Sequence, residues 1–163
     1  MIVERSGKET IHITTEEGRT TDKFDAKFTE LMMVSPYNDF DINSVNLSSM
    51  VYTPLSGVSF KSISALDSTD YASYGLDAPW TRIWMKYTVE ADESTGTKAH
   101  TEEKELLISP LKGGKYYAKL GDYDAIFEFS KSTFEFVDNI DPYHLINRIG
   151  FITNIDTVES INL

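Results

Sequence analysis

Alternating apolar and polar positions run through most of this chain and predict a protein rich in β-strands. Near the N-terminus, residues 2–4 and 10–14 alternate on either side of Ser6-Gly7-Lys8, which predicts a β-hairpin. The same alternation predicts further strands at residues 58–63, 80–90, 103–109, 115–120, 124–129 and 157–163. Gly121-Asp122 lies between two of these segments and predicts a second hairpin.

Helical spacing of apolar positions occurs in three places. Asp22 is a suitable N-cap for a helix over residues 23–34, in which Phe24, Phe28 and Leu31 recur at helical intervals. A second helix is predicted over residues 44–52, with Pro54 and Gly57 ending it. Near the C-terminus, Ser132 is the predicted cap of a helix that carries Phe134, Val137 and Ile140, and Asp141-Pro142 starts another helix.

These elements predict an α+β fold with a mainly antiparallel sheet and helices packed on one face. No alternation of strand and helix and no repeat of fixed length is visible in the sequence, so parallel and solenoid folds are disfavoured. One domain over residues 1–163 is expected. Residues 1–66 contribute a hairpin and helices, and residues 70–163 form a strand-rich half.

The composition indicates a folded core and disfavours several classes of binding partner. Of the 163 residues, 40% are hydrophobic and 12% aromatic, which is enough for a sizeable core. With 26 Asp and Glu against 15 Lys and Arg, the net charge of −11 disfavours binding to nucleic acid or to anionic lipid. Cysteine is absent, and no apolar run reaches the roughly 18 residues that a membrane helix needs.

The segment Tyr74-Gly75-Leu76-Asp77-Ala78-Pro79 is the most distinctive local pattern in the chain. Gly75 allows a positive φ, and Pro79 prevents a helix from continuing into the following strand. The segment therefore predicts a stiff junction that ends a loop and begins a strand of the sheet. Gly75 is expected to adopt a conformation that a β-carbon disfavours.

Oxygen-bearing side chains at Asp39, Asp41 and Asn43 imitate the start of a calcium-binding loop. Ser44 stands where such a loop needs glycine, and Met50 stands where it needs a bidentate glutamate. A turn followed by a helix cap is therefore the preferred interpretation, and no calcium site is predicted.

Other candidate chemistry is equally incomplete. Asp138, Asp141 and His144 are close in sequence and suitable for zinc, but Asp141 is better explained as an N-cap. Gly113-Gly114-Lys115 lacks the other residues of a phosphate-binding loop. The paired acids Glu102-Glu103 point to opposite faces of a strand. The sequence therefore predicts no metal site, no cofactor and no catalytic residue, and the protein is not expected to be an enzyme.

An aromatic and cationic stripe is the one candidate interaction surface. On the predicted strand 80–90, Trp80, Arg82, Trp84 and Lys86 share one face, and Ile83, Met85, Tyr87 and Val89 share the other. The second face is expected to lie in the core. The first is either a platform for a sugar or a protein, or a surface beneath a helix, and packing is favoured, with at least one indole mostly buried.

The order of the motifs in the second half resembles that of a known family. The resemblance is carried by the Tyr74–Pro79 hexapeptide, which fits a "YGLD-x-P" pattern, and by Leu106-Leu107-Ile108, Tyr116-Tyr117-Ala118-Lys119 and Ala125-Ile126-Phe127. Residues 71–163 resemble the bacterial domain of unknown function 4340 family in this order. Ser109 replaces the family's glycine, and Ile126-Phe127 replaces its "VY" step. Residues 1–66 agree with the family only in general layout.

The resemblance implies an extracytoplasmic domain of a bacterial envelope protein. Such proteins are often membrane-anchored by a segment that this chain lacks, and some serve ABC-type transport systems. We therefore expect a non-catalytic accessory or interaction domain, excised from a longer anchored protein, with protein partners. A small-molecule or carbohydrate-binding module that uses an aromatic surface is the alternative.

Overall fold

The computed structural model describes residues 1–15, 31–38, 40–66, 69–121 and 123–148, and its centre is a single antiparallel sheet. Nine strands of the described residues pair in the order β4-β3-β2-β1-β6-β7-β8-β9-β5. The strands are β1 (Ile2–Arg5), β2 (Ile11–Thr15), β3 (Leu31–Ser35), β4 (Phe40–Asp41), β5 (Ile63–Leu66), β6 (Thr81–Val89), β7 (His100–Ile108), β8 (Lys115–Leu120) and β9 (Ala125–Ser130).

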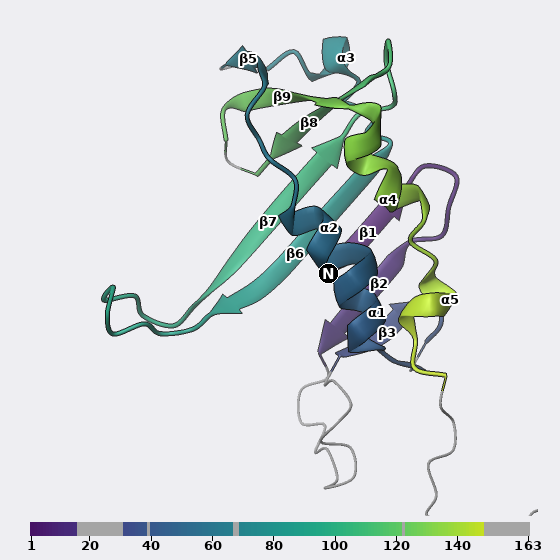
Figure 1. Ribbon diagram of the computed structural model, residues 1–163, viewed down its shortest axis with the longest axis vertical. Helices are drawn as coiled ribbons and strands as arrows, with labels where there is room; N and C mark the ends of the chain where they lie inside the picture. Colours follow the sequence, from purple (N-terminus) through teal and green to yellow (C-terminus); the bar gives the residue numbers. More distant parts are fainter. Residues whose placement is uncertain (16–30, 39, 67–68, 122, 149–163) are drawn as a thin grey trace, which may run out of the picture.

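Short helices lie across one face of this sheet (Figure 1). They are α1 (Ser44–Leu47), the π-helical turn η2 (Ser48–Tyr52), α2 (Thr53–Ser56), the 3₁₀ turn η3 (Lys131–Phe134), α4 (Glu135–Asp138) and α5 (Pro142–Leu145). Helix α3 (Tyr71–Tyr74) lies apart from them, at the end of the sheet beside β5, and its Tyr74 packs edge-on against Tyr117 of β8. The predicted α+β fold with a mainly antiparallel sheet and helices on one face is confirmed.

The core lies between the helices and the sheet. Alternate strand residues such as Val3, Ile13 and Ile83 point into it, and Leu47 and Phe134 come from the helical side. All five are essentially inaccessible to solvent. Because each strand exposes every second residue on the opposite face, that face carries ion pairs instead.

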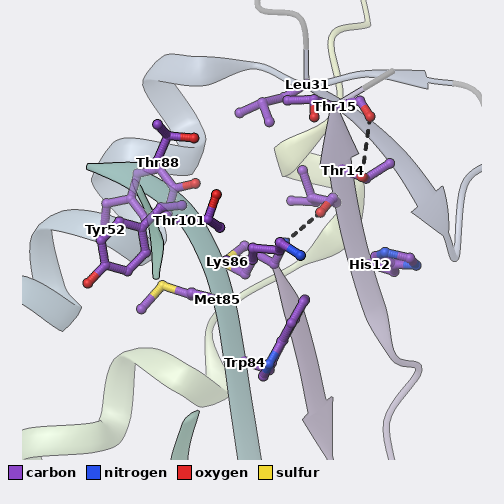
Figure 2. Close-up of a pocket in the computed structure, with 13 residues that line it drawn as sticks. His12, Thr14, Thr15, Leu31, Tyr52, Trp84, Met85, Lys86, Thr88 and Thr101 are labelled. Carbon is purple, nitrogen blue, oxygen red and sulfur yellow. Dashed lines mark hydrogen bonds between the residues drawn. The ribbon is translucent and has the colours of Figure 1, made fainter. Parts of the chain in front are cut away.

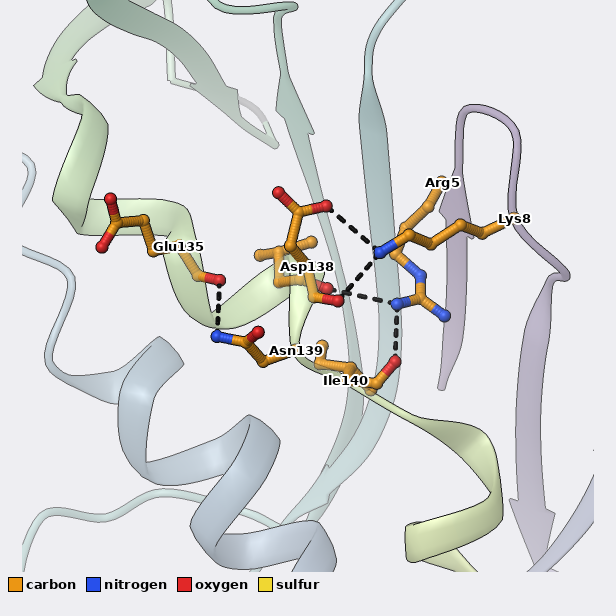
Figure 3. Close-up of polar contacts among 7 residues, drawn as sticks. Arg5, Lys8, Glu135, Asp138, Asn139 and Ile140 are labelled. Carbon is orange, nitrogen blue, oxygen red and sulfur yellow. Dashed lines mark hydrogen bonds and ion pairs between the residues drawn. The ribbon is translucent and has the colours of Figure 1, made fainter.

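Arg5 is the polar exception on the core face, and it joins β1 to α4 (Figure 3). Its guanidinium donates hydrogen bonds to the carbonyl oxygens of Val137 and Ile140, at 3.2 and 2.6 Å. These carbonyls lie at and just beyond the end of α4, where a helix leaves acceptors without intrahelical partners. Burial lowers the pKa of Arg5, and the carboxylates of Asp138 and Asp141 oppose that shift.

The glycine junction takes the predicted form. Gly75 has a φ of 71° and ends α3, with its N–H bonded to the carbonyls of Ala72 and Tyr71. A β-carbon on Gly75 would lie 3.3 Å from Cδ of Pro110. The expectation that a β-carbon is disfavoured there is confirmed, because both the backbone conformation and the neighbouring proline oppose it.

Two predicted elements are wrong in type or position. Residues 31–34 belong to strand β3 and not to the predicted helix 23–34, because pairing with β2 buries Met33 in the core; residues 23–30 lie outside the described residues. Strand β5 begins at Ile63 and not at residue 58. Phe60 instead packs edge-on against Phe127 and Phe129, which holds the preceding segment out of regular pairing.

Helix boundaries also differ from the predictions. Pro54 does not end the second helix, which continues through α2 to Ser56. The π turn before it changes the bonding pattern, and Pro54 takes a first-turn position that needs no N–H donor. Ser130, and not Ser132, precedes the C-terminal helical run. Asp141 caps α5 as predicted, and the predicted strand 157–163 lies outside the described residues.

Candidate binding site at the free edge of strand β6

Strands β6 and β7 form a long hairpin of which only one end is held in the sheet. The two strands pair over nine positions, from Thr81 with Ile108 to Val89 with His100. Strand β1 pairs with β6 only as far as Trp84, and β8 pairs with β7 only from Leu106 onward. The rest of the hairpin, residues 85–104, projects from the body of the molecule (Figure 1), and we call it the β6–β7 arm.

One face of the arm carries a network centred on the carboxylate of Glu102. Tyr87 donates its hydroxyl to Oε2 at 2.8 Å, and His100 Nε2 lies 3.2 Å from Oε1. Lys104 Nζ lies 3.5 Å from the same carboxylate. The hydrogen bond from Tyr87 and then that from His100 lower the pKa of Glu102. The pKa of His100 is raised, first by its Nδ1 bond to the carbonyl of Lys98 and then by Glu102.

These shifts predict that the arm is most ordered in mildly acidic solution. Because the pKa of His100 is raised in the fold, protonated His100 stabilises the folded arm at low pH. This contribution is lost as the pH rises through the raised pKa. Because the pKa of Glu102 is lowered, ionised Glu102 stabilises the folded arm above the ordinary pKa of a glutamate. This contribution is lost as the pH falls through the lowered pKa. Both contributions coexist between about pH 4.5 and 6.5, the ordinary values of the two groups. Amide exchange at Tyr87 should therefore be slower at pH 5.5 than at pH 8, after correction for intrinsic rates.

Nuclear magnetic resonance titration of the His100 ring gives the matched test. The Glu102→Gln variant should lower the His100 pKa without returning it fully, because the bond to Lys98 remains. A His100 that titrates at or below the value of an unfolded peptide would contradict the network.

The opposite face of β6 and β7 carries separate ion pairs, of which only Lys86–Glu103 lies in the arm. Lys86 lies 3.2 Å from Glu103, and Arg82 lies 3.2 Å from Glu105 and 3.7 Å from Glu4. Each of these side chains is about half exposed, so the pairs contribute little to stability. Glu102 and Glu103 thus point to opposite faces, as their adjacency on a strand predicts.

A hollow of about 720 Å³ separates the arm from β2, and we call it the edge notch. Figure 2 shows its walls: β2 on one side, β6 on the other, and Tyr52 of η2. Met1 closes its inner end, where the terminal amine donates to the carbonyl of Ile13 at 2.7 Å and the Ile13 N–H donates back at 2.9 Å. The described lining residues are Met1, His12, Ile13, Thr14, Thr15, Leu31, Tyr52, Trp84, Met85, Lys86, Tyr87, Thr88 and Thr101.

The predicted interaction stripe is divided between two hollows. Trp84 and Lys86 line the edge notch, whereas Trp80 and Arg82 line a second hollow of about 410 Å³. Trp80 precedes β6 and stacks on the buried Tyr116, with ring centroids 5.2 Å apart. Both indoles are half-buried.

The predicted core face of β6 loses contact with the core along the arm. Ile83 is fully buried, Met85 and Val89 are half-buried, and Tyr87 is 42% exposed. The expectation that all four residues lie in the core is therefore wrong, because the arm projects from the body of the molecule and the side chains of this face become more exposed along it (Figure 1).

An apolar groove on the helical face was not predicted. It measures about 410 Å³, and three exposed tyrosines, Tyr52, Tyr87 and Tyr123, surround it. Leu55, Phe60, Met85, Leu106 and Leu120 form much of the remaining lining. We call it the tyrosine groove. Its residues come from η2, α2, three strands and two connecting segments, so no local pattern in the sequence could indicate it.

The residues considered for metal binding do not form a common site in the described residues. Asn43 caps α1 by accepting from the N–H of Asn46, as the helix-cap interpretation predicts, and Asp39 lies outside the described residues. Asp138 pairs with Lys8, and His144 Nδ1 lies 3.3 Å from Asp141. Within the described part of the chain, no group of three His, Asp or Glu residues is placed to hold a metal ion.

Comparison with known proteins found no relative of this chain. No family model, curated protein or solved structure matches the chain. Among the described residues, no helix is both long and apolar enough to cross a membrane.

Proposed function

We propose that this chain is a non-catalytic interaction domain of a bacterial envelope protein, located outside the cytoplasm, that binds a protein partner along the free edge of β6. The partner is a component of the envelope, such as part of an ABC-type transport complex. The resemblance of residues 71–163 supports the location, and the edge notch beside the β6–β7 arm supports the mode of binding.

The projecting β6–β7 arm carries the proposal, and no strand of the described residues pairs with its β6 edge beyond Trp84. An isolated two-stranded ribbon is only marginally stable in water, and a free strand edge presents hydrogen-bonding groups that another chain can use. Proteins usually shield such edges with charge, with proline or with a covering element. From Met85 to Val89, Lys86 is the only charged residue and proline does not occur. This edge is therefore suited to a partner.

The charge of the chain supports a protein as the partner. With a net charge of −11, the domain repels nucleic acid and anionic lipid. The described residues that line the edge notch nevertheless include no Asp or Glu, and they include Lys86 and His12. The described lining of the notch therefore differs in charge from the chain as a whole.

A small-molecule-binding module is the second candidate, and the tyrosine groove favours it. Pockets for small ligands are mostly apolar, with a few polar groups that fix orientation. The hydroxyls of Tyr52, Tyr87 and Tyr123 supply such groups around an apolar floor. A ligand in this groove should protect Tyr123, which is 60% exposed, from chemical modification.

Site-specific cross-linking in intact bacteria that produce the full-length native protein tests the proposal. A photoreactive benzoylphenylalanine at Thr88 in the edge notch should capture an envelope protein, whereas the same residue at Leu111 should not. Leu111 is a matched control because it is exposed and lies outside the described lining of the notch. A membrane-impermeant amine reagent should also label the domain in intact spheroplasts. Equal capture from both positions, or a domain that the reagent cannot reach, would contradict the proposal.

A further inference from the structure

The tyrosine groove runs across the strands on the helical face of the sheet. Met85 of β6, Leu106 of β7 and Leu120 of β8 line it in turn. A smaller hollow of about 170 Å³ shares Leu120 with the groove and reaches Phe127 of β9. Because β6, β7, β8 and β9 are neighbours in the sheet, the two hollows together span about 14 Å, which is three strand spacings of roughly 4.8 Å.

Most side chains along this path are apolar and only half-buried. Leu55, Phe60, Met85 and Leu120 all keep part of their surface open to solvent. Covering such surface with a ligand is favourable, because apolar area is removed from water. An extended hydrocarbon chain matches the length of this path, whereas a single compact ring would cover only one part of it.

A cation marks the end of the groove that lies on the arm. Lys104 is the only charged side chain in the described lining, and 41% of it is exposed. Its Nζ lies 3.5 Å from Oε2 of Glu102, which is longer than an ordinary hydrogen bond. Glu102 has closer partners in the Tyr87 hydroxyl at 2.8 Å and His100 Nε2 at 3.2 Å. Because an ammonium has three donors, Lys104 can also bind the anionic group of a ligand.

We propose that the tyrosine groove binds a fatty acid, with the carboxylate on Lys104 and the unbranched tail along the groove toward Phe127. This rests on the second of the two proposed functions, the small-molecule-binding module, and names the class of its ligand. Buried apolar area supplies most of the affinity, and the ion pair fixes the direction of the tail. The net charge of −11 disfavours an anionic lipid surface, but a single molecule in the groove meets Lys104 as the only charge of the described lining.

Calorimetry with three amphiphiles, each below the concentration at which it forms micelles, measures the binding directly. Dodecanoate should bind at least tenfold more tightly than octanoate, because its longer tail buries more apolar surface along the groove. Dodecyltrimethylammonium has the same tail and the opposite charge, and it should bind at least tenfold more weakly than dodecanoate. Attraction to the net charge of −11 alone would favour the cation instead. No binding of dodecanoate, or equal or tighter binding of the cation, would overturn the proposal.

Two lysine variants test the position of the carboxylate. Lys104→Met should lower the affinity for dodecanoate at least tenfold, and Lys104→Arg should keep it within threefold of the parent. Lys86→Met removes the same charge from the opposite face of the sheet, beside Glu103, and should change the affinity less than threefold. Equal losses from Lys104→Met and Lys86→Met would show that binding follows the overall charge, and would overturn the proposal.

Two serine variants test the position of the tail. Ser56 and Ser49 are exposed helical residues whose hydroxyls bond to the carbonyls of Thr53 and Asn46, and of the two only Ser56 lines the groove. Ser56→Trp should therefore lower the affinity for dodecanoate at least tenfold, and Ser49→Trp less than threefold. Equal affinities of these two variants would overturn the proposal. If thermal melts show that Ser56→Trp does not fold, the lysine variants decide the outcome.

The cross-linking experiment at Thr88 separates this proposal from the proposed protein partner. Capture of an envelope protein by a domain that does not bind dodecanoate would retain the protein partner and reject the fatty-acid site. Binding of dodecanoate with the expected effects of the variants, but without capture at Thr88, would support the fatty-acid site and reject the protein partner.

Discussion

Replacing Arg5 with methionine is expected to lower the free energy of unfolding by about 2–3 kcal/mol, because the buried carbonyl of Ile140 loses its side-chain donor and the carbonyl of Val137 loses one of its donors. Arg5 is 7% exposed, and its guanidinium bonds to Val137 and Ile140 at the end of α4. Methionine keeps most of the apolar length of the side chain, so the loss reports the hydrogen bonds more than the packing. Urea unfolding, with the slope checked for constancy, measures the effect.

Lys8→Met provides the control for this variant. Lys8 contacts the same end of α4, through the carbonyl and carboxylate of Asp138 at 2.8 and 3.2 Å, but its side chain is 40% exposed. An exposed pair of this kind contributes about 0–1 kcal/mol. Equal destabilisation by the two variants would show that Arg5 does not hold α4 on the sheet.

Gly75→Val is expected to cost about 1–3 kcal/mol, through backbone strain at a positive φ. The φ of 71° is unfavourable for a β-branched residue, and Pro110 lies 3.3 Å from the position of the new β-carbon. The junction also precedes β6, so a change there disturbs the strand that joins the two halves of the sheet. Thermal and urea unfolding should both report the loss.

The matched substitution is Gly96→Val. Gly96 has a similar φ of 73°, but no atom lies within 4 Å of a β-carbon there. Gly96 lies in the turn at the tip of the arm, which can rearrange without disturbing the core, so a smaller loss is expected. A Gly75→Val protein as stable as the parent would contradict the junction.

The sequence alone determined the elements whose residues carry local signals. Alternation located β1, β2, β6, β8 and β9, because a half-buried strand must alternate apolar and polar residues. Gly75 marked a positive-φ junction before β6, and Asp141 marked a helix start, through backbone chemistry that does not depend on distant contacts. The order of these elements was enough to predict an antiparallel α+β fold.

Tertiary structure decided the elements whose local pattern was ambiguous. Residues 31–34 have apolar residues at helical spacing, and pairing with β2 made them a strand. Strand β5 begins only at Ile63, because Phe60 packs against Phe127 and Phe129 and does not pair in the sheet. Local propensity is a weak constraint, and contacts with distant residues override it in such segments.

Almost all of the candidate site was decided by tertiary structure. Alternation placed Trp84 and Lys86 on one face of a strand, but it could not show that pairing with β1 stops at Trp84. The edge notch lies between β2 and the arm, and the tyrosine groove joins residues of η2 and α2 to residues of β6, β7 and β8. A sequence specifies which residues a strand presents, whereas only the assembled sheet decides which of its edges remains free.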